Sequence, residues 1–315
     1  MKCSVAMTTY NGEKYIVDLM QSIRMQNRMP DEVIIFDDHS SDRTADIVKK
    51  FIHENDFKNW KIIINEERVG WKKNFRRAIR ECHEEIVFLA DQDDIWMPEK
   101  IQKMMEVMES NCKIDLLASN YVAFFDGYNK HKEVYRIRGL KRDDGKVEHI
   151  GIKRSFLSIM RPGCTFCFRK ELYNELKKKD IEEYPHDSIL WATALINNSL
   201  YIYNKILIKF RRHGDNASIS KIEYGLNRRI AEIDYCIKLD EWAISYMNDD
   251  TNDVKTMKIV CSQYAFELKR KKVMMQNSLA QVVVFVFLNC RNYPTIRNCL
   301  GDIFFSLHEN ITQKF

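Results

Sequence analysis

Several features that would assign this chain to a class at once are missing from its sequence. No apolar run reaches the roughly 20 residues of a membrane-spanning helix, and the run SLAQVVVFVFLNC at 278–290 is too short. The first ten residues, MKCSVAMTTY, are too short and too polar for a secretory signal peptide. Neither a phosphate-binding Gly-x-x-x-x-Gly-Lys-Ser/Thr loop nor an EF-hand loop occurs. There is also no internal repeat and no low-complexity segment.

Strong charge and a disulfide framework are missing too. The net charge is only +5, so the composition does not indicate a nucleic-acid partner. The nine cysteines are odd in number and scattered, which favours a reducing, cytoplasmic location. The basic run 269–272 precedes the apolar run 278–290, which leaves two interpretations open. The apolar run is either a buried helix or strand, or a peripheral contact at the inner face of the cell membrane.

The first 110 residues alternate between strand-like and helix-like segments. With 315 residues, 45% of them hydrophobic, the chain can bury one large core or a core with a smaller appendage. Continuous apolar strands between amphipathic helices predict an α/β fold, with a mostly parallel, Rossmann-like sheet flanked by helices. Strands are predicted at 3–10, 31–38, 60–65 and 85–90, and helices at 13–26, 40–52, 70–82 and 97–108.

The second part of the chain follows a looser pattern. Shorter strands are predicted at 115–125, 162–170 and 200–210, and the residues beyond are helical and basic. We therefore expect a catalytic-type domain over 1–215, with halves 1–110 and 111–215. A C-terminal, mainly helical extension would cover 216–315, as a separate domain, a homodimer interface or a membrane contact.

Acidic residues cluster at predicted strand ends. Asp91, Asp93 and Asp94 follow the fourth strand, and FDDHSSD at 36–42 ends the second. Carboxylates this close repel each other and are costly to desolvate unless a cation or ligand compensates. The ends of parallel strands are where such sheets bind ligands, and an Asp-x-Asp pair suits Mg²⁺ or Mn²⁺. The alternative is a solvated loop in which Asp94 caps the next helix.

A set of motifs extends this pattern, and together the motifs resemble those of a known protein family. TTYNG at 8–12, FDDHSSD, NEERVGWKKNF at 65–75 and the Asp-x-Asp, in this order, resemble the nucleotide-sugar half of family 2 glycosyltransferases with the GT-A fold. RPGCTFCFRKEL, YPHDSILWATAL and KFRRHGDNAS resemble the acceptor half of bacterial rhamnosyltransferase-like members. The chain departs from those members in HDSILW, where His-Asp-Trp-Trp is usual, and in Phe210, where tyrosine is usual.

The resemblance implies roles for the donor site. Asp38 would accept the N3–H of a pyrimidine base, and Asp91 would lie near the ribose or the metal. Asp93 and His213 would be the metal ligands for Mg²⁺ or Mn²⁺, which bridges the two phosphates. The residues expected to bind the nucleotide sugar are Thr9, Tyr10, Asn11, Glu13, Asp38, Arg68, Gly70, Asn74, Asp91, Gln92 and Arg212, with Arg211 as the alternative to Arg212 near the phosphates.

The resemblance also implies an acceptor site. Asp187 would be the general base of an inverting transfer, although it also suits the cap or first turn of a helix. The residues expected to contact the acceptor are Gly163, Cys164, Thr165 and His186, for which packing is the alternative explanation.

The function implied is a metal-dependent, inverting sugar transfer to a glycan hydroxyl in bacterial cell-surface polysaccharide synthesis. The leading donor is dTDP-L-rhamnose, with UDP-hexose or UDP-N-acetylhexosamine as alternatives, and the acceptor is lipid-linked or a polysaccharide. A nucleotidyl or phosphoryl transferase is less favoured, because the chain lacks a dedicated phosphate loop. A catalytically inactive binding subunit is less favoured because Asp38, Asp91, Asp93 and Asp187 are all present.

Overall fold

The chain divides into two compact units. The computed structural model describes residues 1–125, 142–152, 157, 159–176, 179, 181–213, 225–250 and 253–312. One unit comprises Met1–Gly151 with Ser158–Asn216, and the other comprises Ile152–Leu157 with Ala217–Phe315. The domain boundary expected at residue 215 lies outside the described residues. Strands from both expected halves, 1–110 and 111–215, belong to one sheet in the first unit.

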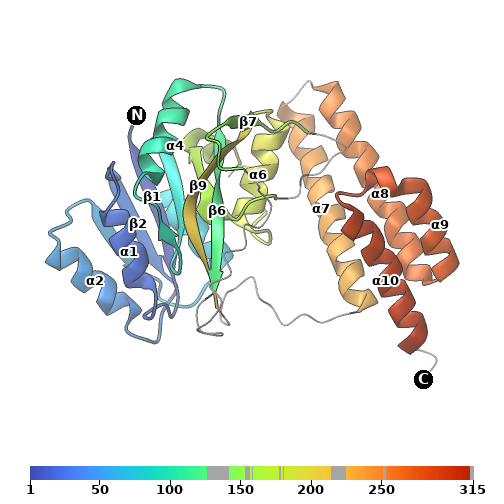
Figure 1. The fold of residues 1–315 in the computed structure, drawn as a ribbon, viewed down its shortest axis with the longest axis horizontal. Helices are drawn as coiled ribbons and strands as arrows, with labels where there is room; N and C mark the ends of the chain where they lie inside the picture. Colours follow the sequence, from blue (N-terminus) through green and yellow to red (C-terminus); the bar gives the residue numbers. More distant parts are fainter. Residues whose placement is uncertain are drawn as a thin grey trace. The chain divides into compact units, whose positions relative to one another are not determined.

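The described part of the first unit contains a nine-stranded sheet with the order β3-β2-β1-β4-β8-β6-β9-β5, and β7 pairs with β9 (Figure 1). The strands are β1 (Cys3–Thr9), β2 (Glu32–Asp37), β3 (Trp60–Ile64), β4 (Ile86–Asp91), β5 (Ile95–Trp96), β6 (Leu116–Phe125), β7 (Val147–His149), β8 (Phe166–Arg169) and β9 (Leu200–Arg212). Strands β1 to β4 are parallel, as their alternation with helices predicts. Strand β8 runs antiparallel to β4 and β6, so the second half of the sheet is mixed.

Helices cover both faces of this sheet. Helices α1 (Ile16–Arg24), α2 (Thr44–Glu54) and α4 (Lys100–Ser110) share one apolar cluster with alternate residues of the strands. Helix α3 (Trp71–Glu81) packs against β1 and β2 and also contacts α6 (His186–Ile196). Helix α5 (Lys170–Leu176) packs on α6. The α/β fold class predicted from the sequence is therefore confirmed.

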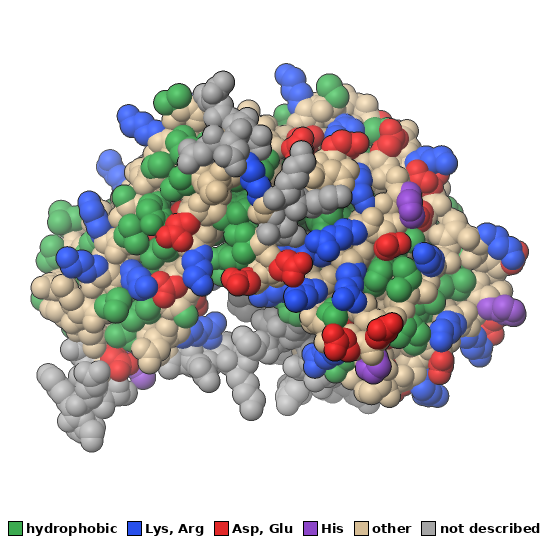
Figure 2. All heavy atoms as spheres, turned by 180° about the vertical axis from the view of Figure 1, so that it is seen from behind, with side chains coloured by type: hydrophobic (Ala, Val, Ile, Leu, Met, Phe, Trp, Pro, Cys, Tyr) green, Lys and Arg blue, Asp and Glu red, His purple; other side chains and the backbone are tan. Residues whose placement is uncertain are grey.

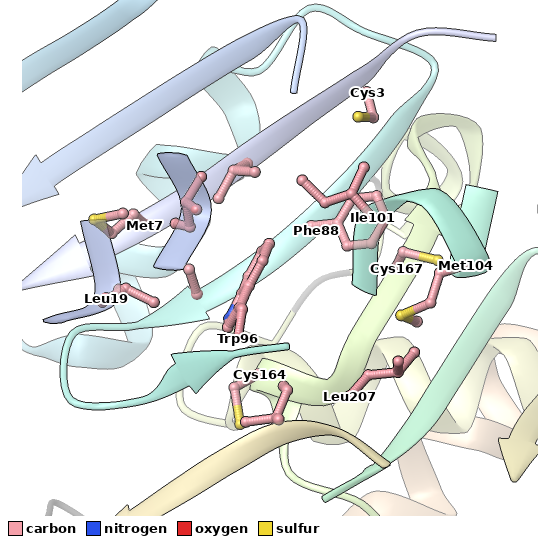
Figure 3. Close-up of a cluster of buried hydrophobic side chains, with 14 of the residues drawn as sticks. Cys3, Met7, Leu19, Phe88, Trp96, Ile101, Met104, Cys164, Cys167 and Leu207 are labelled. Carbon is pink, nitrogen blue, oxygen red and sulfur yellow. The ribbon is translucent and has the colours of Figure 1, made fainter. Parts of the chain in front are cut away.

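The apolar cluster extends to the end of β4. Figure 3 shows Trp96 of β5 beside Leu19 of α1 and Cys164, which belongs to the short 3₁₀ helix η1 (Gly163–Thr165). The rings of Trp96 and Phe88 lie 6.0 Å apart between centroids. The predicted helix 97–108 begins later, at Lys100, because β5 first pairs with β9. The N-cap of α4 is Glu99, so the hypothesis that Asp94 caps this helix is wrong.

The second unit is helical over its described residues. It contains α7 (Leu226–Asp250), α8 (Val254–Gln276), α9 (Leu279–Asn289), the 3₁₀ helix η2 (Cys290–Asn292) and α10 (Ile296–Thr312). Helix α8 begins where the side chain of Asp253 accepts hydrogen bonds from the backbone amides of Lys255 and Thr256. None of the described helices is long and apolar enough to cross a membrane.

A buried ionic network joins three helices of this unit. The carboxylate of Asp302 on α10 accepts hydrogen bonds from Arg229 Nε of α7 at 2.6 Å and from Arg270 Nε of α8 at 2.7 Å. The hydroxyl of Tyr293 donates a third, at 2.6 Å. Burial opposes the ionisation of Asp302, but the hydrogen bonds and charge of Arg270, with that of Arg229, hold its pKa below the ordinary value.

The substitution Asp302→Asn should strongly destabilise the second unit. It removes the charge that compensates two buried guanidinium groups, and breaking a buried pair from one side typically costs about 3–5 kcal/mol. Urea unfolding of the full chain, followed by circular dichroism, measures this loss. The matched control is Glu232→Gln, at a half-exposed partner of Arg229, which should cost less than about 1 kcal/mol. Equal stabilities for the two variants would contradict the assigned role of the network.

Candidate active site

The loops that follow the parallel strands meet at one edge of the sheet. In the register of β1 with its neighbours, Thr9 pairs with Asp37 and Thr8 pairs with Asp91. Thr9 is buried, and its hydroxyl donates a 2.7 Å hydrogen bond to the carboxylate of Asp37. The polar residues that the sequence places at successive strand ends are therefore neighbours in space.

The loop after β1 is fastened to the loop after β4 by a side-chain amide. Gln92 Oε1 accepts from the backbone amide of Tyr10 at 2.8 Å, and Gln92 Nε2 donates to the Tyr10 carbonyl at 2.9 Å. A Cβ at Gly12 would lie 2.6 Å from Gln92 Cδ, so this approach requires glycine. The guanidinium carbon of Arg68 lies 4.0 Å from the centroid of the Tyr10 ring, in a cation–π contact. Three residues predicted to bind the nucleotide sugar, Tyr10, Arg68 and Gln92, are thus brought together.

Two other predicted residues, Asn11 and Glu13, fasten the loop after β1 to the loop after β2. Asn11 adopts a left-handed conformation, with φ of 46°, and its side-chain oxygen accepts from the amide of Ser41 at 2.9 Å. Glu13 accepts from the amide of Arg43 at 3.1 Å. Both side chains therefore shape the rim of the site through contacts with backbone.

Asp38 organises the segment that carries Arg68. It is buried, and its carboxylate accepts from the amides of Val69 at 2.7 Å and Gly70 at 2.8 Å. Gly70 has φ of 85° and ψ of 150°, a conformation that is essentially restricted to glycine. Asn74 is buried, and it donates to the carbonyl of Phe36 at 2.8 Å. Its role in binding the nucleotide sugar stays a prediction, because in this structure its contacts are with the protein.

The acidic cluster lies where β4 ends. Burial, followed by the charges of Asp93 and Asp187, raises the pKa of Asp91 to about 7. Asp94 is fully buried, and it accepts a 3.1 Å hydrogen bond from the backbone amide of Arg211. Burial, followed by the charges of Asp93 and Asp91, raises the pKa of Asp94 well above its ordinary value. A nearby cation is therefore needed to ionise all of these carboxyl groups at neutral pH.

The donor atoms of this cluster fit a divalent cation. His213 Nε2 lies 2.8 Å from Asp93 Oδ2, and both side chains are largely buried. Asp91, Asp94 and Cys164 each offer one ligand atom, all within 4.8 Å of one another, and Asp94 Oδ2 has no hydrogen-bond partner among the described residues. Burial raises the pKa of the Cys164 thiol, which disfavours it as a ligand. Asp91 and Asp94 then offer oxygen donors, and Asp93 with His213 forms a second pair; oxygen donors suit Mg²⁺ or Mn²⁺.

Arg211 is a site residue that the sequence analysis offers only as an alternative to Arg212. Its Nε donates to the Asp93 carbonyl at 2.8 Å, and its guanidinium carbon lies 4.6 Å from the centroid of the Tyr15 ring. The ring of His213 also lies 4.6 Å from that of Tyr15, whereas the predicted Arg212 lies over Phe210. Side chains alternate along a strand, so the period of two could have placed Arg211 with His213.

Lys100 lies near the acidic cluster, although the sequence analysis does not single it out. It is completely buried at the start of α4, where its Nζ donates a 2.9 Å hydrogen bond to the carbonyl of Cys164. The same nitrogen lies 3.5 Å from the centroid of the Trp96 ring. Burial lowers the pKa of Lys100 to about 7, while the charges of Asp94 and Asp91 act in the opposite direction. The sequence does not indicate that Lys100 belongs to the site. It occupies an ordinary position in a predicted amphipathic helix, and the carboxylates near it belong to another element.

Asp187 lies in the first turn of α6, beside η1. Its Oδ1 accepts from the amide of Ser188 at 2.8 Å, and a Cβ at Gly163 would come within 2.9 Å of Asp187 Cβ. Burial raises the pKa of Asp187 to about 6, against the lowering effect of hydrogen bonds from the Ser188 and Gly163 amides. Asp187 is partly exposed, so a carboxyl group that ionises near neutral pH is accessible beside the acidic cluster.

The other predicted acceptor residues are buried around Asp187. The ring of His186 stacks on Phe75 with 4.1 Å between centroids, and burial lowers its pKa to about 3. Thr165 donates to the carbonyl of Pro162 at 2.7 Å, and Cys164 lies in the apolar cluster. For these residues a direct contact with an acceptor stays a prediction, because the contacts described above are all with other parts of the protein.

Comparisons with known proteins agree with this geometry. The family described as glycosyl transferase family 2 matches residues 4–176. The chain is 29% identical over 234 residues to dTDP-rhamnosyl transferase RfbG of Shigella flexneri, which covers 69% of this chain and 75% of that protein. It is 26% identical over 226 residues to the GalNAc(5)-diNAcBac-PP-undecaprenol beta-1,3-glucosyltransferase of Campylobacter jejuni, with 71% and 70% covered.

A solved structure shows the same fold. The crystal structure of S. aureus TarS 1-349 in complex with UDP-GlcNAc has a TM-score of 0.62 and 21% identity, and the alignment covers 91% of this chain and 81% of TarS 1-349. The family match spans more than half of the 315 residues. This chain therefore belongs to glycosyl transferase family 2 and has the GT-A type of fold.

Proposed function

We propose that this glycosyltransferase moves a sugar, with inversion, from a nucleoside diphosphate to a hydroxyl group of a glycan. The observation that carries the proposal is the convergence of Asp91, Asp93 and Asp187 from two distant segments at the carboxyl end of β4. Two of these carboxyl groups suit cation and diphosphate binding, and the third is placed to take a proton. A nucleotidyl or phosphoryl transferase is less favoured, because the sequence contains no dedicated phosphate loop.

The donor would bind across the loops after β1 and β2. The paired Tyr10 and Arg68 offer an aromatic face and a positive charge, which suit a base and the phosphates that follow it. Asp38 accepts three hydrogen bonds from the protein, with the third from Asn65 Nδ2 at 3.1 Å. Because a carboxylate offers about four lone pairs, one remains for the N3–H of a uracil or thymine.

Asp93 and His213 would hold the metal ion, with Asp91 next to them. When bound, the cation supplies positive charge that stabilises the departing nucleoside diphosphate. Arg211 lies at the same place: its guanidinium donates to the Asp93 carbonyl, lies against Tyr15 and pairs with Asp18 at 2.6 Å. Arg211 is thus a second candidate for contact with the phosphates, beside the predicted Arg212.

Asp187 would act as the general base. In an inverting transfer the acceptor hydroxyl attacks the sugar carbon from the side opposite the leaving group, and a carboxylate accepts its proton. The Ser188 and Gly163 amides fix the orientation of this carboxylate. A pKa near 6 leaves Asp187 ionised at neutral pH yet more basic than an ordinary aspartate.

For the donor sugar we propose L-rhamnose carried by dTDP, which the similarity to a dTDP-rhamnosyl transferase favours. A UDP-hexose or UDP-N-acetylhexosamine is the competing donor, favoured by the fold shared with TarS, whose structure contains UDP-GlcNAc. For the acceptor we propose a lipid-linked oligosaccharide, because the Campylobacter relative is named for a substrate on PP-undecaprenol.

The donor proposal predicts metal-dependent stabilisation by pyrimidine nucleotides. With Mn²⁺, dTDP or UDP compounds should raise the melting temperature of the chain, since a ligand at 100 times its Kd adds about 2.7 kcal/mol. Asp93→Asn should lose the metal-dependent part of the shift. The control Asp46→Asn, at an exposed position on α2, should keep all of it.

The same thermal shifts distinguish the donors. A larger shift with dTDP-rhamnose than with UDP-glucose or UDP-GlcNAc supports rhamnose, and the reverse order supports the alternative. If no sugar nucleotide stabilises the folded protein, the proposed donor site is wrong.

The general-base proposal predicts a pH-dependent loss of rate. Protonated Asp187 cannot accept a proton, so the rate should fall about tenfold per pH unit as the pH drops below about 6. Asp187→Asn should lower kcat by about 10²–10⁴-fold without changing the donor-induced shift in melting temperature. Release of the nucleoside diphosphate from the best-binding donor measures both effects.

The control for this test is Glu182→Gln, an exposed partner of Lys73 close in sequence to α6, which should keep the parent rate and pH profile. An Asp187→Asn variant that retains most of the rate, or that keeps the acid limb of the profile, would rule out Asp187 as the base.

A further inference from the structure

Helix α9 presents apolar side chains on opposite faces. Val282 and Val286 are buried in the core of the helical unit. The other face is open: Phe287 is 81% exposed and Leu288 is 74% exposed, and Val283 and Val284 lie one turn before them. A helix that is apolar all round normally lies in a protein core or in contact with lipid. The exposed face of α9 therefore requires a partner.

Helix α10 continues this apolar surface. Its exposed large hydrophobic residues recur every three or four positions, which places them on one stripe: Ile296, Leu300, Phe304 and Leu307. Helices α9 and α10 pack against each other. Figure 2 shows hydrophobic side chains gathered over the helical unit, at the left of the view, with lysine and arginine side chains and some acidic ones around them.

The charges within the segment that carries most of this surface have one sign. Residues 268–301 contain no acidic residue, and they contain the basic residues Lys269, Arg270, Lys271, Lys272, Arg291 and Arg297. The acidic residues that flank this segment, Glu267 and Asp302, are buried and bonded to Arg270. The exposed basic side chains of this segment are Lys269, Lys272, Arg291 and Arg297, and Lys271 pairs with Asp234 on α7.

We propose that the exposed faces of α9 and α10, flanked by these four cations, form a docking surface for a lipid bilayer with anionic headgroups. Aromatic and aliphatic side chains enter the acyl boundary of a bilayer, and lysine and arginine bind the headgroups above it. The helices lie on the bilayer, which accords with the lack of a membrane-spanning helix among those described.

A second copy of the chain fits this surface less well. In a two-fold dimer the same patch meets itself, so the cations of one copy face those of the other. Like charges brought together across an interface are unfavourable, whereas an anionic bilayer supplies the opposite charge. The proposal rests on helices α8 to α10 alone and is independent of the proposed donor and acceptor.

Sedimentation of the full chain with vesicles tests the proposal. The chain should bind vesicles of equal parts phosphatidylglycerol and phosphatidylcholine at least tenfold more strongly than vesicles of phosphatidylcholine alone. Binding should weaken as salt is raised, because the headgroup attraction is screened. The double variant Phe287→Ser/Leu288→Ser should reduce binding at least tenfold, and Lys269→Glu/Lys272→Glu should remove the preference for anionic vesicles.

Two matched controls exclude a general effect of substitution. Val254→Ser changes an exposed apolar residue at the other end of α8, and Lys58→Glu reverses an exposed charge in the first unit; both should bind like the parent chain. The donor-induced shift in melting temperature should be unchanged in every variant, which separates this test from that of the proposed function. Each variant should also unfold at the same urea concentration as the parent.

Three outcomes would overturn the proposal. One is the absence of vesicle binding by the folded parent chain. Another is equal binding to anionic and neutral vesicles. The third is a parent chain that ignores vesicles but forms a dimer which dissociates in the Phe287→Ser/Leu288→Ser variant, since that result assigns the surface to a second copy.

Discussion

The charge balance at the carboxyl end of β4 constrains the elements around it. Asp91, Asp93 and Asp94 approach one another in partly or fully buried positions, where unpaired carboxylates would be unstable. The charge of Lys100, which follows the cluster closely in the chain, opposes this repulsion, and the backbone amide of Arg211 on β9 donates a hydrogen bond to Asp94. A strand from the second half of the domain therefore helps to hold the acidic cluster that the first half supplies.

Backbone contacts hold the rest of the site in shape. Asp38 uses its carboxylate to order the segment that carries Arg68, and Gln92 holds the backbone of Tyr10. Gly163 permits α6 to approach so closely that Asp187 points at the acidic cluster. Much of the polar chemistry in these loops thus serves to position a few groups, which reduces the ordering that substrate binding must supply.

The helical unit arranges polar and apolar groups in the opposite way. Several of its charges are buried, where Asp302 joins Arg229 and Arg270, while large apolar side chains of α9 and α10 face outward. A buried ionic network fixes the relative positions of α7, α8 and α10 without using apolar surface. Apolar side chains are thereby left available on the outside, where they can contact a partner.

Local patterns in the sequence determined the alternation of strands and helices, the four parallel strands and the aspartates at their ends. Side-chain period, turn residues and strand order along the chain are local properties, so they can be predicted from the sequence alone. Because side chains alternate along a strand, the sequence of β9 also implies that Arg211 and His213 lie on the same side. Only the tertiary structure decided that Lys100 is buried against the carbonyl of Cys164, that His186 is buried on Phe75, and that α9 has an exposed face. These features depend on contacts between segments far apart in the chain, which no local pattern encodes.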